Sequence, residues 1–568
     1  MHHQRLPHPR PLSPRHPLHP SRLRASVLAL AASAVFPILG AHAATPDAGQ
    51  ILQEPRAPLS APGSGAPALR IDSADGSSVP EGGAQVRLVA IRFSGNTAFD
   101  SAALQGLLAD AVGKELSFAD LNRLAARVTR HYRDGGYLVA RAYLPAQEVK
   151  DGVLDIALLE GTLGQVSIIN NAGLKDSALA PLRALPLNAP LQAQSLDRSL
   201  LSLSDLPGTR VQSTLRPGTT VGASDLLVEV NKTSALQGSV DADNFGSSYT
   251  GEYRVGTNLY WNNPLDRGDQ LSLRLQASDT HLHYERLGYQ LPLGSFGTRA
   301  GVALSHIDYR LGKDFAALDA GGKADTASLY LRQPLQRSLA SNWYAQLQLD
   351  AKNLKDTVGS TATNSTQRLR NAVLGLNGDW QDAWLGGSSN SLALNLTSGQ
   401  LRLDAASQVQ DAASAKSAGR FSKLGYQLQR LQALPANWSM ALNLSGQVAD
   451  KNLASAEKFG LGGSSGVRAF AQGEGLGDAG WLVSAALRWQ PAAGWQVQAF
   501  YDAGSVQVNH QAWSSANSNH KHLAGAGVGL GWGTDKLSFS LTSAWVTEGQ
   551  RSDGKRGPRL WGQASWAF

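Results

Sequence analysis

From residue 236 to the C-terminus, apolar and polar residues alternate in short segments, which is the pattern of β-strands with two different faces. In QLSLRLQ, Leu271, Leu273 and Leu275 share one face, and Ser272 and Gln276 lie on the other. SLALNLT, WSMALNLSGQV, LSFSLTSAW and the final LWGQASWAF repeat this alternation. The pattern predicts an all-β region over residues 236–568.

Helical periodicity occurs before this region, in the segment 84–161. The strand-like AQVRLVAIRFSGN is followed by a predicted helix from about Asp100 to Val112 and by a second helix that opens at Ser117. Ser117 and Asp120 resemble a capping box, and Gly135-Gly136 ends the helix. Two predicted strands, YLVARAYL and GVLDIALLEG, complete a β-α-α-β-β order, which is typical of a small α+β domain.

The same order recurs more faintly over residues 162–232. GQVSIIN precedes two predicted helices near 177–185 and 195–203, and TRVQSTL and SDLLVEVN follow. Two tandem copies of one module favour a repeated binding surface over an active site. The alternative is that the likeness reflects only how common small α+β units are.

An alternating apolar face fits either a soluble β-sandwich or a membrane barrel. The barrel is favoured because Trp and Tyr cluster at strand ends, as in LYWNNP and SNWYAQ, and because the chain ends on the Phe568 of a strand. The polar face is rich in Gln, Ser, Asn and Thr, which suits a wet interior. Roughly 20 residues per strand and connection give on the order of 16 antiparallel strands.

The N-terminus adds a secretory signal. Residues 1–43 contain a basic lead, an apolar run from Ala25 to Gly40 and the cleavage-site pattern Ala41-His42-Ala43. The early histidines fall in this segment, so a metal site there is disfavoured. Residues 44–83 are rich in Pro, Gly, Ala and Ser and contain one short predicted helix at 47–54, before a linker.

Charge and composition exclude several function classes. The formal net charge of +7 includes five arginines in residues 1–43, so the rest of the chain carries +2 and gives no reason to expect nucleic-acid binding. The sequence contains no cysteine, which suits an oxidising compartment. It contains no P-loop and offers no catalytic setting of the G-x-S-x-G or H-E-x-x-H kind, so an enzyme is disfavoured, and we expect no metal or cofactor.

Several motifs in this order carry a family resemblance that covers nearly the whole mature chain. IRFSGNTAF and LPAQEVKDGVLDIALLEG look like a POTRA (polypeptide-transport-associated) domain, and DNFGSSYTGEYR with NPLDRGDQL looks like a first barrel hairpin. GVRAF resembles the tip of a long sixth extracellular loop, and FYDAG resembles a later strand motif that carries an acid. The chain thus resembles the TpsB transporters of two-partner secretion, which belong to the BamA-like outer-membrane superfamily.

The resemblance implies a domain order and a set of motif residues. The order is signal peptide 1–43, possible plug helix and linker 44–83, POTRA domain 1 at 84–161, POTRA domain 2 at 162–232 and the transmembrane β-barrel at 236–568. The barrel motif positions are Asp243, Asn244, Gly246, Gly251, Phe500 and Gly504. Trp566 and Phe568 are expected to form the C-terminal signal for barrel assembly.

A gating latch is predicted from Gly466, Val467, Arg468, Phe470 and Asp502. The alternation of GWQVQAFYDAG places Asp502 in the barrel lumen, where a carboxylate is tolerated and can pair with a cation brought by a glycine-rich loop. The alternative is that Arg468 is a solvated loop residue.

The sequence departs from the family pattern at two positions of the latch. Alanine stands at 469, where glycine is usual, and at 486, where many relatives carry an acid. The second departure leaves a second lumenal partner for the arginine in doubt.

The resemblance implies an outer-membrane transporter, without catalysis, that captures a large unfolded exoprotein through its POTRA domains and passes it through the barrel. We expect the exoprotein to carry an N-terminal secretion domain, and expect the transporter to be a monomer in outer-membrane lipid, with POTRA domains in the periplasm. Periplasmic chaperones and the barrel assembly machinery would act during its biogenesis. The alternatives are an assembly factor for other barrels, an enzyme and a passive porin. The segment 47–54 is either a helix that plugs the pore or a disordered tail.

Overall fold

The computed structural model describes residues 45–53, 68–71, 85–513 and 518–568 of the 568-residue chain. The predicted signal peptide and most of the predicted linker lie outside these residues. The described part contains two α/β modules, a closed β-barrel and one short helix near its beginning.

The first module has the predicted β-α-α-β-β order. Its three-stranded sheet has the order β3-β6-β5, and the buried side of helix α3 packs in a core with Leu154 and Ile156 of that sheet. The capping box of Ser117 and Asp120 is present at the start of α3. The elements are β2 (Val86–Arg87), β3 (Ala90–Ser94), α2 (Ser101–Leu107), η1 (Ala109–Ala111), β4 (Glu115–Leu116), α3 (Phe118–Asp134), β5 (Arg141–Tyr143) and β6 (Val153–Leu159).

The first predicted strand is split in two. β2 pairs with β4, whereas β3 pairs with β6 in the three-stranded sheet. Between them, Leu88 N donates to Lys114 O at 2.9 Å and Val89 N donates to Gly152 O at 2.7 Å. The alternation therefore shifts by one residue, so that Leu88 is buried and Val89 is exposed. A continuous strand over AQVRLVAIRFSGN would place Val89 and Ile91 on one face; that expectation from the sequence was wrong for this reason.

The second module carries a four-stranded sheet of order β1-β8-β9-β7. Its outermost strand, β1 (Ala68–Ile71), comes from the segment before the first module and pairs in parallel with β8. Leucines of α5 and η2–α4 pack with Val211, Leu226 and Val228 of the sheet. The other elements are β7 (Thr162–Asn170), η2 (Asp176–Leu179), α4 (Ala180–Arg183), α5 (Ala193–Ser204), β8 (Thr209–Pro217) and β9 (Ala223–Lys232).

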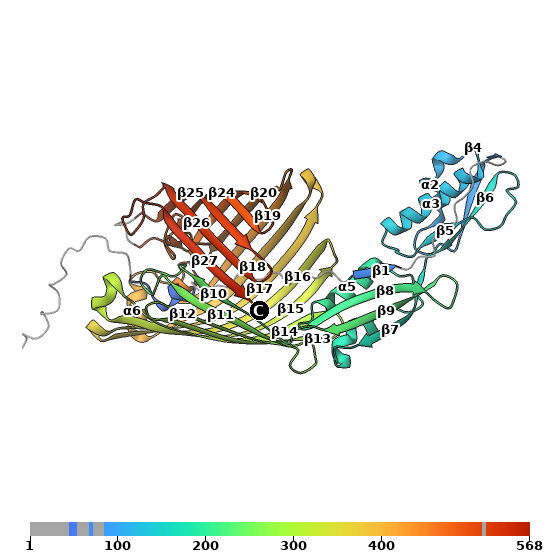
Figure 1. Ribbon diagram of the computed structural model, residues 1–568. Coiled ribbons are helices and arrows are strands. Elements are labelled where there is room, and N and C mark those ends of the chain that lie inside the picture. Colours follow the sequence, from blue (N-terminus) through green and yellow to red (C-terminus); the bar gives the residue numbers. More distant parts are fainter. Residues whose placement is uncertain (1–44, 54–67, 72–84, 514–517) are drawn as a thin grey trace, which may run out of the picture. The chain divides into compact units, whose positions relative to one another are not determined.

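Sixteen antiparallel strands form the closed barrel, in which β10 pairs with both β11 and β27 (Figure 1). The seam between β10 and β27 has five residue pairs and is the shortest ladder in the described barrel. The strands are β10 (Leu236–Asp243), β11 (Arg254–Asn262), β12 (Gln270–Ser278), β13 (Leu282–Leu293), β14 (Thr298–Arg310), β15 (Ala320–Arg337), β16 (Ser341–Val358), β17 (Thr363–Asp382), β18 (Ser388–Leu403), β19 (Gly419–Leu434), β20 (Trp438–Ala449), β23 (Ala479–Trp489), β24 (Trp495–Gln507), β25 (His520–Gly533), β26 (Leu537–Glu548) and β27 (Arg559–Ala567).

Connections at the two ends of the barrel differ in length. β9 leads directly into β10, so the modules join the end that carries the short turns between β11 and β12, β13 and β14, and the following pairs. The long connections lie at the opposite end. They contain η3 (Lys313–Leu318), η4 (Gly359–Thr361), α6 (Ala405–Ala412), η6 (Ser455–Glu457), β21 (Phe459–Gly460) and β22 (Leu476–Gly477); η5 (Trp384–Gly386) lies in a short turn.

The two faces of the barrel wall have the predicted chemistry. Large apolar side chains such as Leu275, Leu347 and Leu442 are exposed on the outside, an apolar area that lipid would cover. Tryptophans stack across neighbouring strands near the short turns, as Trp343 does with Trp380 at 5.8 Å between ring centroids and Trp438 with Trp489 at 5.9 Å. Tryptophans are expected at this level of the barrel because they favour the membrane interface. Among the described residues, no helix is both long and apolar enough to cross a membrane.

Candidate functional site: the long loop in the barrel

The loop between β20 and β23, residues 450–478, is the longest connection in the barrel and corresponds to the predicted sixth extracellular loop. Two short strands within it, β21 and β22, pair with each other and bring its two limbs together. Its tip is buried: Val467, Ala469 and Phe470 each have no exposed surface. The tip therefore packs inside the protein and is not free in solvent.

The glycine-rich run before Arg468 is a tight turn. Val467 N donates to Leu461 O at 2.7 Å, and a Cβ on Gly466 would collide with that same carbonyl group. Gly463 has a φ of +125°, which L side chains rarely adopt. Close backbone packing therefore explains the glycines of this run.

Arg468 and Asp502 meet in a bidentate ion pair. Arg468 Nε lies 2.8 Å from Asp502 Oδ2, and Arg468 Nη2 lies 2.7 Å from Asp502 Oδ1. The backbone N–H of Arg468 also donates to Oδ2, at 3.1 Å. The Asp502 side chain is fully buried and that of Arg468 is 14% exposed. Removing one partner of such a pair leaves a buried charge without its counterion, which costs about 3–5 kcal/mol.

The strand β24 faces the lumen as the alternation predicts. Trp495, Val497 and Tyr501 are exposed on the outer face, whereas Phe500 and Asp502 are buried on the inner face. The Arg468 guanidinium lies over the Phe500 ring, 3.3 Å from its centroid. Phe500 thus adds a cation–π contact to the ion pair.

Ser484 of β23 is a second lumenal partner for the arginine. Its hydroxyl accepts from Arg468 Nη2 at 3.1 Å and donates to Asp502 Oδ1 at 2.7 Å. It lies two residues before Ala486, on the same strand. Arg468 therefore has two polar side-chain partners in the wall, Asp502 and Ser484, although alanine stands at 486.

Apolar residues of the tip fill a socket in the wall. Phe470 packs in a buried cluster with Leu461 of the loop and with Leu482, Phe500 and Leu523 of the wall. Gly525 of β25 provides room for Ala469, since a Cβ at 525 would collide with the Ala469 methyl group. Gly504 similarly provides room for Leu461. The alanine in place of the usual glycine is thus accommodated by the wall.

The first barrel hairpin contacts the same tip through β27. Trp561 Nε1 donates to Arg468 O at 2.7 Å, and the Trp561 ring packs edge-on against Phe245 at 5.8 Å. Asn244 extends the β10–β27 seam, because its side chain accepts from Gly562 N at 2.7 Å and donates to Leu560 O at 3.0 Å. The loop tip therefore contacts the strand that closes the barrel.

The other predicted motif residues shape this hairpin or lie at the far end of the barrel. Asp243 pairs with Arg254 at 2.8 Å, both buried. Gly246 lies against the Gly251 carbonyl, and Gly251, with a φ of +115°, lies against Ser278. Trp566 and Phe568 lie on the exposed outer face, with ring centroids 5.2 Å apart, and do not approach the tip.

The comparisons with known proteins agree with this arrangement. Residues 222–532 match the family model "Haemolysin secretion/activation protein ShlB/FhaC/HecB", and residues 86–161 match the model "POTRA domain, ShlB-type". The chain belongs to the ShlB/FhaC/HecB family. Its members are the TpsB transporters of two-partner secretion, so this chain is an outer-membrane transporter with periplasmic POTRA domains.

Individual relatives support the assignment. The heme/hemopexin transporter protein HuxB of Haemophilus influenzae is 30% identical over 384 residues, which cover 67% of this chain and 68% of HuxB. The outer membrane transporter CdiB of Dickeya dadantii is 25% identical over 416 residues, 72% of each chain. The solved structure of CdiB from Escherichia coli has a TM-score of 0.70, with 21% identity over 87% of this chain and 92% of that one.

A further polar cluster of this transporter holds the part of the long loop that precedes its tip. Glu457, at the end of η6, pairs with Lys352 of β16 at 2.7 Å and Lys423 of β19 at 2.8 Å. Asn371 of β17 also donates to it, at 2.8 Å. Burial by itself raises the pKa of Glu457, but the two lysine ammonium groups outweigh burial and lower the pKa to about 2. Glu457 is thus ionised throughout the neutral range and holds η6 against three wall strands.

Helix α1 (Ala48–Ile51) also contacts η6. The Ser455 hydroxyl donates to the Asp47 carboxylate at 2.6 Å, and Gln53 Nε2 donates to Ser455 O at 2.6 Å. Ala48 N donates to Asp356 of β16 at 2.7 Å, and Ala48 and Ile51 are buried against the wall. η6 is therefore shared by the α1 helix and the long loop.

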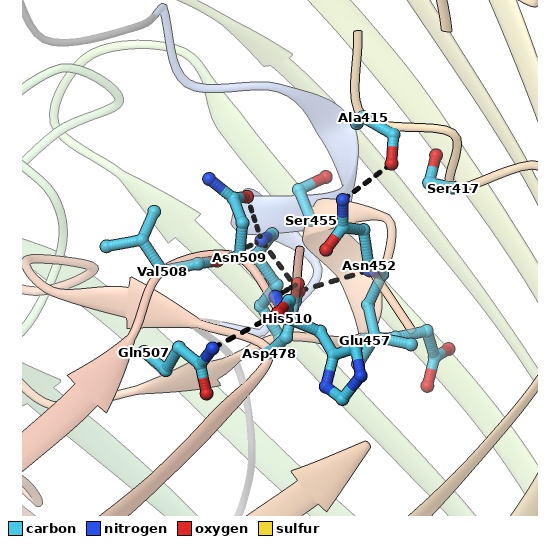
Figure 2. Close-up of polar contacts among 12 residues, drawn as sticks. Ala415, Ser417, Asn452, Ser455, Glu457, Asp478, Gln507, Val508, Asn509 and His510 are labelled. Atoms are coloured by element: carbon cyan, nitrogen blue, oxygen red, sulfur yellow. Dashed lines mark hydrogen bonds and ion pairs between the residues drawn. The ribbon is translucent and has the colours of Figure 1, made fainter. Parts of the chain in front are cut away.

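The base of the loop has its own carboxylate anchor, Asp478, in the network that Figure 2 shows. Asp478 is fully buried; its Oδ1 lies 2.7 Å from Lys458 Nζ, and its Oδ2 accepts from His510 N at 2.8 Å. Asn452 donates to Ala415 O at 2.6 Å and accepts from Gln511 N at 2.7 Å. These bonds tie the base of the long loop to the connections on both sides of it.

The sequence alone does not predict the roles of Glu457, Asp478, Ser484 or Trp561. Isolated charged residues in a loop usually indicate solvation, and the lysines that pair with Glu457 are far away along the chain. Trp561 lies in a strand whose alternation was recognised, but nothing in its local sequence indicates a contact with Arg468.

Proposed function

We propose that this transporter exports one large exoprotein with an N-terminal secretion domain, which the POTRA modules capture in an unfolded, extended form. The observation that carries the proposal is the loop tip inside the barrel, held on Asp502 by Arg468. Because a few polar bonds and one apolar cluster hold the tip, it can leave the barrel wall and bind it again, as passage of a polypeptide through the barrel requires. The heme/hemopexin and haemolysin transporters among its relatives leave the identity of this cargo open.

The latch is proposed to set the balance between closed and conducting states. A pair of this kind in a partly hydrated lumen contributes on the order of 1–3 kcal/mol, which biases a gate without holding the barrel together. Helix α1 is proposed to plug the resting pore, because it is buried against the wall and bonded to η6 and Asp356.

The remaining parts of the proposal concern surroundings and chemistry. The transporter acts as a monomer in outer-membrane lipid, without catalysis, metal or cofactor. Trp566 and Phe568 present the assembly signal to the barrel assembly machinery, after periplasmic chaperones deliver the chain. Folding of the exoprotein outside the cell supplies direction, since ATP is not available at that membrane.

A comparison of surface and secreted proteomes between the parent strain and a strain that lacks this chain tests the export function. We expect one very large protein to disappear from the cell exterior while other outer-membrane proteins stay at their normal levels. A joint decline of many outer-membrane barrels would instead favour an assembly factor and would contradict dedicated export.

A further inference from the structure

The outer edge of the second module is occupied by a short strand from elsewhere in this chain. β1 comes from the segment between α1 and the first module, and its residues Ala68–Ile71 pair in parallel with Gln212–Leu215 of β8. The other edge of β8 is paired with β9 along the whole strand. β1 is therefore an added strand and not part of the β-α-α-β-β unit.

β1 covers its edge incompletely. β8 has nine residues, whereas β1 pairs with four of them. A parallel pair of this length forms few backbone hydrogen bonds, each with a net value of about 0.5–1.5 kcal/mol. A longer extended segment could form more of these bonds along the same edge and so displace β1.

The side chains of β8 suit recognition through the backbone. Val211, Ser213 and Leu215 are buried toward the module, while Arg210, Gln212 and Arg216 are exposed. The exposed face is thus polar and offers no apolar pocket that would demand a particular sequence. Strand addition at such an edge accepts many extended polypeptides, because main-chain hydrogen bonds supply the affinity.

We propose that the β8 edge is a docking site for an extended segment of the unfolded exoprotein, and that β1 is a resident strand that this segment displaces. This inference rests on the proposed export function, to which it adds the site of capture and a built-in competitor. Since β1 must leave before the segment pairs, β1 lowers the apparent affinity of the edge and limits capture to segments that form a longer ladder.

A disulfide lock tests this displacement directly, and the absence of native cysteine makes the test clean. Ala68 and Gln212 are register partners, so Ala68→Cys with Gln212→Cys would fix β1 on the edge when oxidised. The matched control is Gln212→Cys with Glu229→Cys, which joins β8 to β9 and leaves the outer edge unchanged. The readout is the surface amount of the large protein that is lost when this chain is deleted.

The expected result is that the β1–β8 lock lowers export about tenfold or more, that reductant restores export, and that the β8–β9 disulfide has no effect. Replacement of residues 68–71 by Gly-Ser-Gly-Ser should leave export intact, because the edge is then open. The lock should also act in a chain that lacks residues 45–53, so that its effect does not depend on α1.

Four results would overturn the proposal: normal export by the oxidised lock, failure of the lock to form while the control disulfide forms, loss of export on replacement of β1, or a lock that acts only when α1 is present. Failure of the export function itself is distinguishable, because the reduced double-cysteine chain would then fail to export as well.

Discussion

At the scale of single residues, several buried carboxylates of the barrel, the long loop and the first module are held by donors that fix their orientation. Asp502 binds Arg468 and Ser484, and Glu457 binds two lysines. Glu160 of the first module accepts from Thr97 N at 2.5 Å, Ala98 N at 2.7 Å and the Tyr132 hydroxyl at 2.9 Å. Each of these groups sets the position of a neighbouring loop or helix.

Glu160 leads to a prediction for the stability of the first module. Burial raises the pKa of Glu160, but hydrogen bonds from Ala98 and Thr97 outweigh burial and hold the pKa below its ordinary value of 4.5. The ionised carboxylate therefore stabilises the module above pH 4.5, and this contribution disappears as the pH falls through the lowered pKa. Glu160→Ala should cost about 2–3 kcal/mol at pH 7, because four donors lose their acceptor: the amides of Thr97 and Ala98 and the hydroxyls of Thr97 and Tyr132.

Amide hydrogen exchange of α3 in the full chain measures this loss. Glu148→Ala is the matched control, since Glu148 forms an exposed pair with Lys150 and its removal should change protection little. Equal protection in both variants at pH 7, or a Glu160→Ala effect that persists unchanged well below pH 4, would contradict the assignment.

Residue-level features differ in how far the sequence predicts them. The alternation in GWQVQAFYDAG is enough to place Asp502 on the inner face, because a strand allows two faces only and lipid excludes the carboxylate from one. The pairing of Arg468 with Asp502 came from the family resemblance, since a glycine-rich loop gives no indication of where it lands. Glu457 is not predictable from one sequence, because its partners lie on strands whose register follows from closure of the whole barrel.

At the scale of elements, η6 connects three parts of the molecule. Glu457 holds it against β16, β17 and β19, Ser455 and Gln53 bind it to α1, and β21 continues from it into the latch. The predicted helix at 47–54 is observed as a single buried turn, α1, so that its docking depends on tertiary contacts more than on helix propensity.

Glu457→Gln should weaken the docking of α1 through η6. The change leaves Lys352 and Lys423 beside each other without their shared anion, and their repulsion would push η6 off the wall. In planar bilayers we expect a several-fold rise in mean ion current, approaching that of a chain without residues 45–53. Glu252→Gln, which removes an exposed pair with Lys313, is the control and should conduct like the parent.

The proposed link between Glu457 and α1 would be contradicted if the Glu457→Gln variant conducted like the parent while deletion of residues 45–53 raised the current. In that case α1 would block the pore without help from the glutamate.

At the scale of the whole molecule, the transporter combines a barrel wall with an apolar outer face, a long loop whose tip is buried against the wall, and two α/β modules. The modules and barrel were predictable in order and type, because strand and helix periodicities persist over long segments. The added strand β1 was not, since a four-residue strand in a Pro- and Gly-rich segment carries no such periodicity. The tip of the long loop contacts strands β23, β24, β25 and β27.

A double-mutant cycle of export tests whether the Arg468–Asp502 pair governs transport. Surface amounts of the exoprotein would be measured for Arg468→Ala, Asp502→Ala and the double variant, at equal amounts of folded barrel in the outer membrane. Each single change should alter export by about 5- to 100-fold, which corresponds to about 1–3 kcal/mol. Since the second change removes the charge that the first leaves unpaired, the double variant should export no less than the worse single variant. Parental export by both single variants, or strictly additive losses in the double variant, would contradict the account.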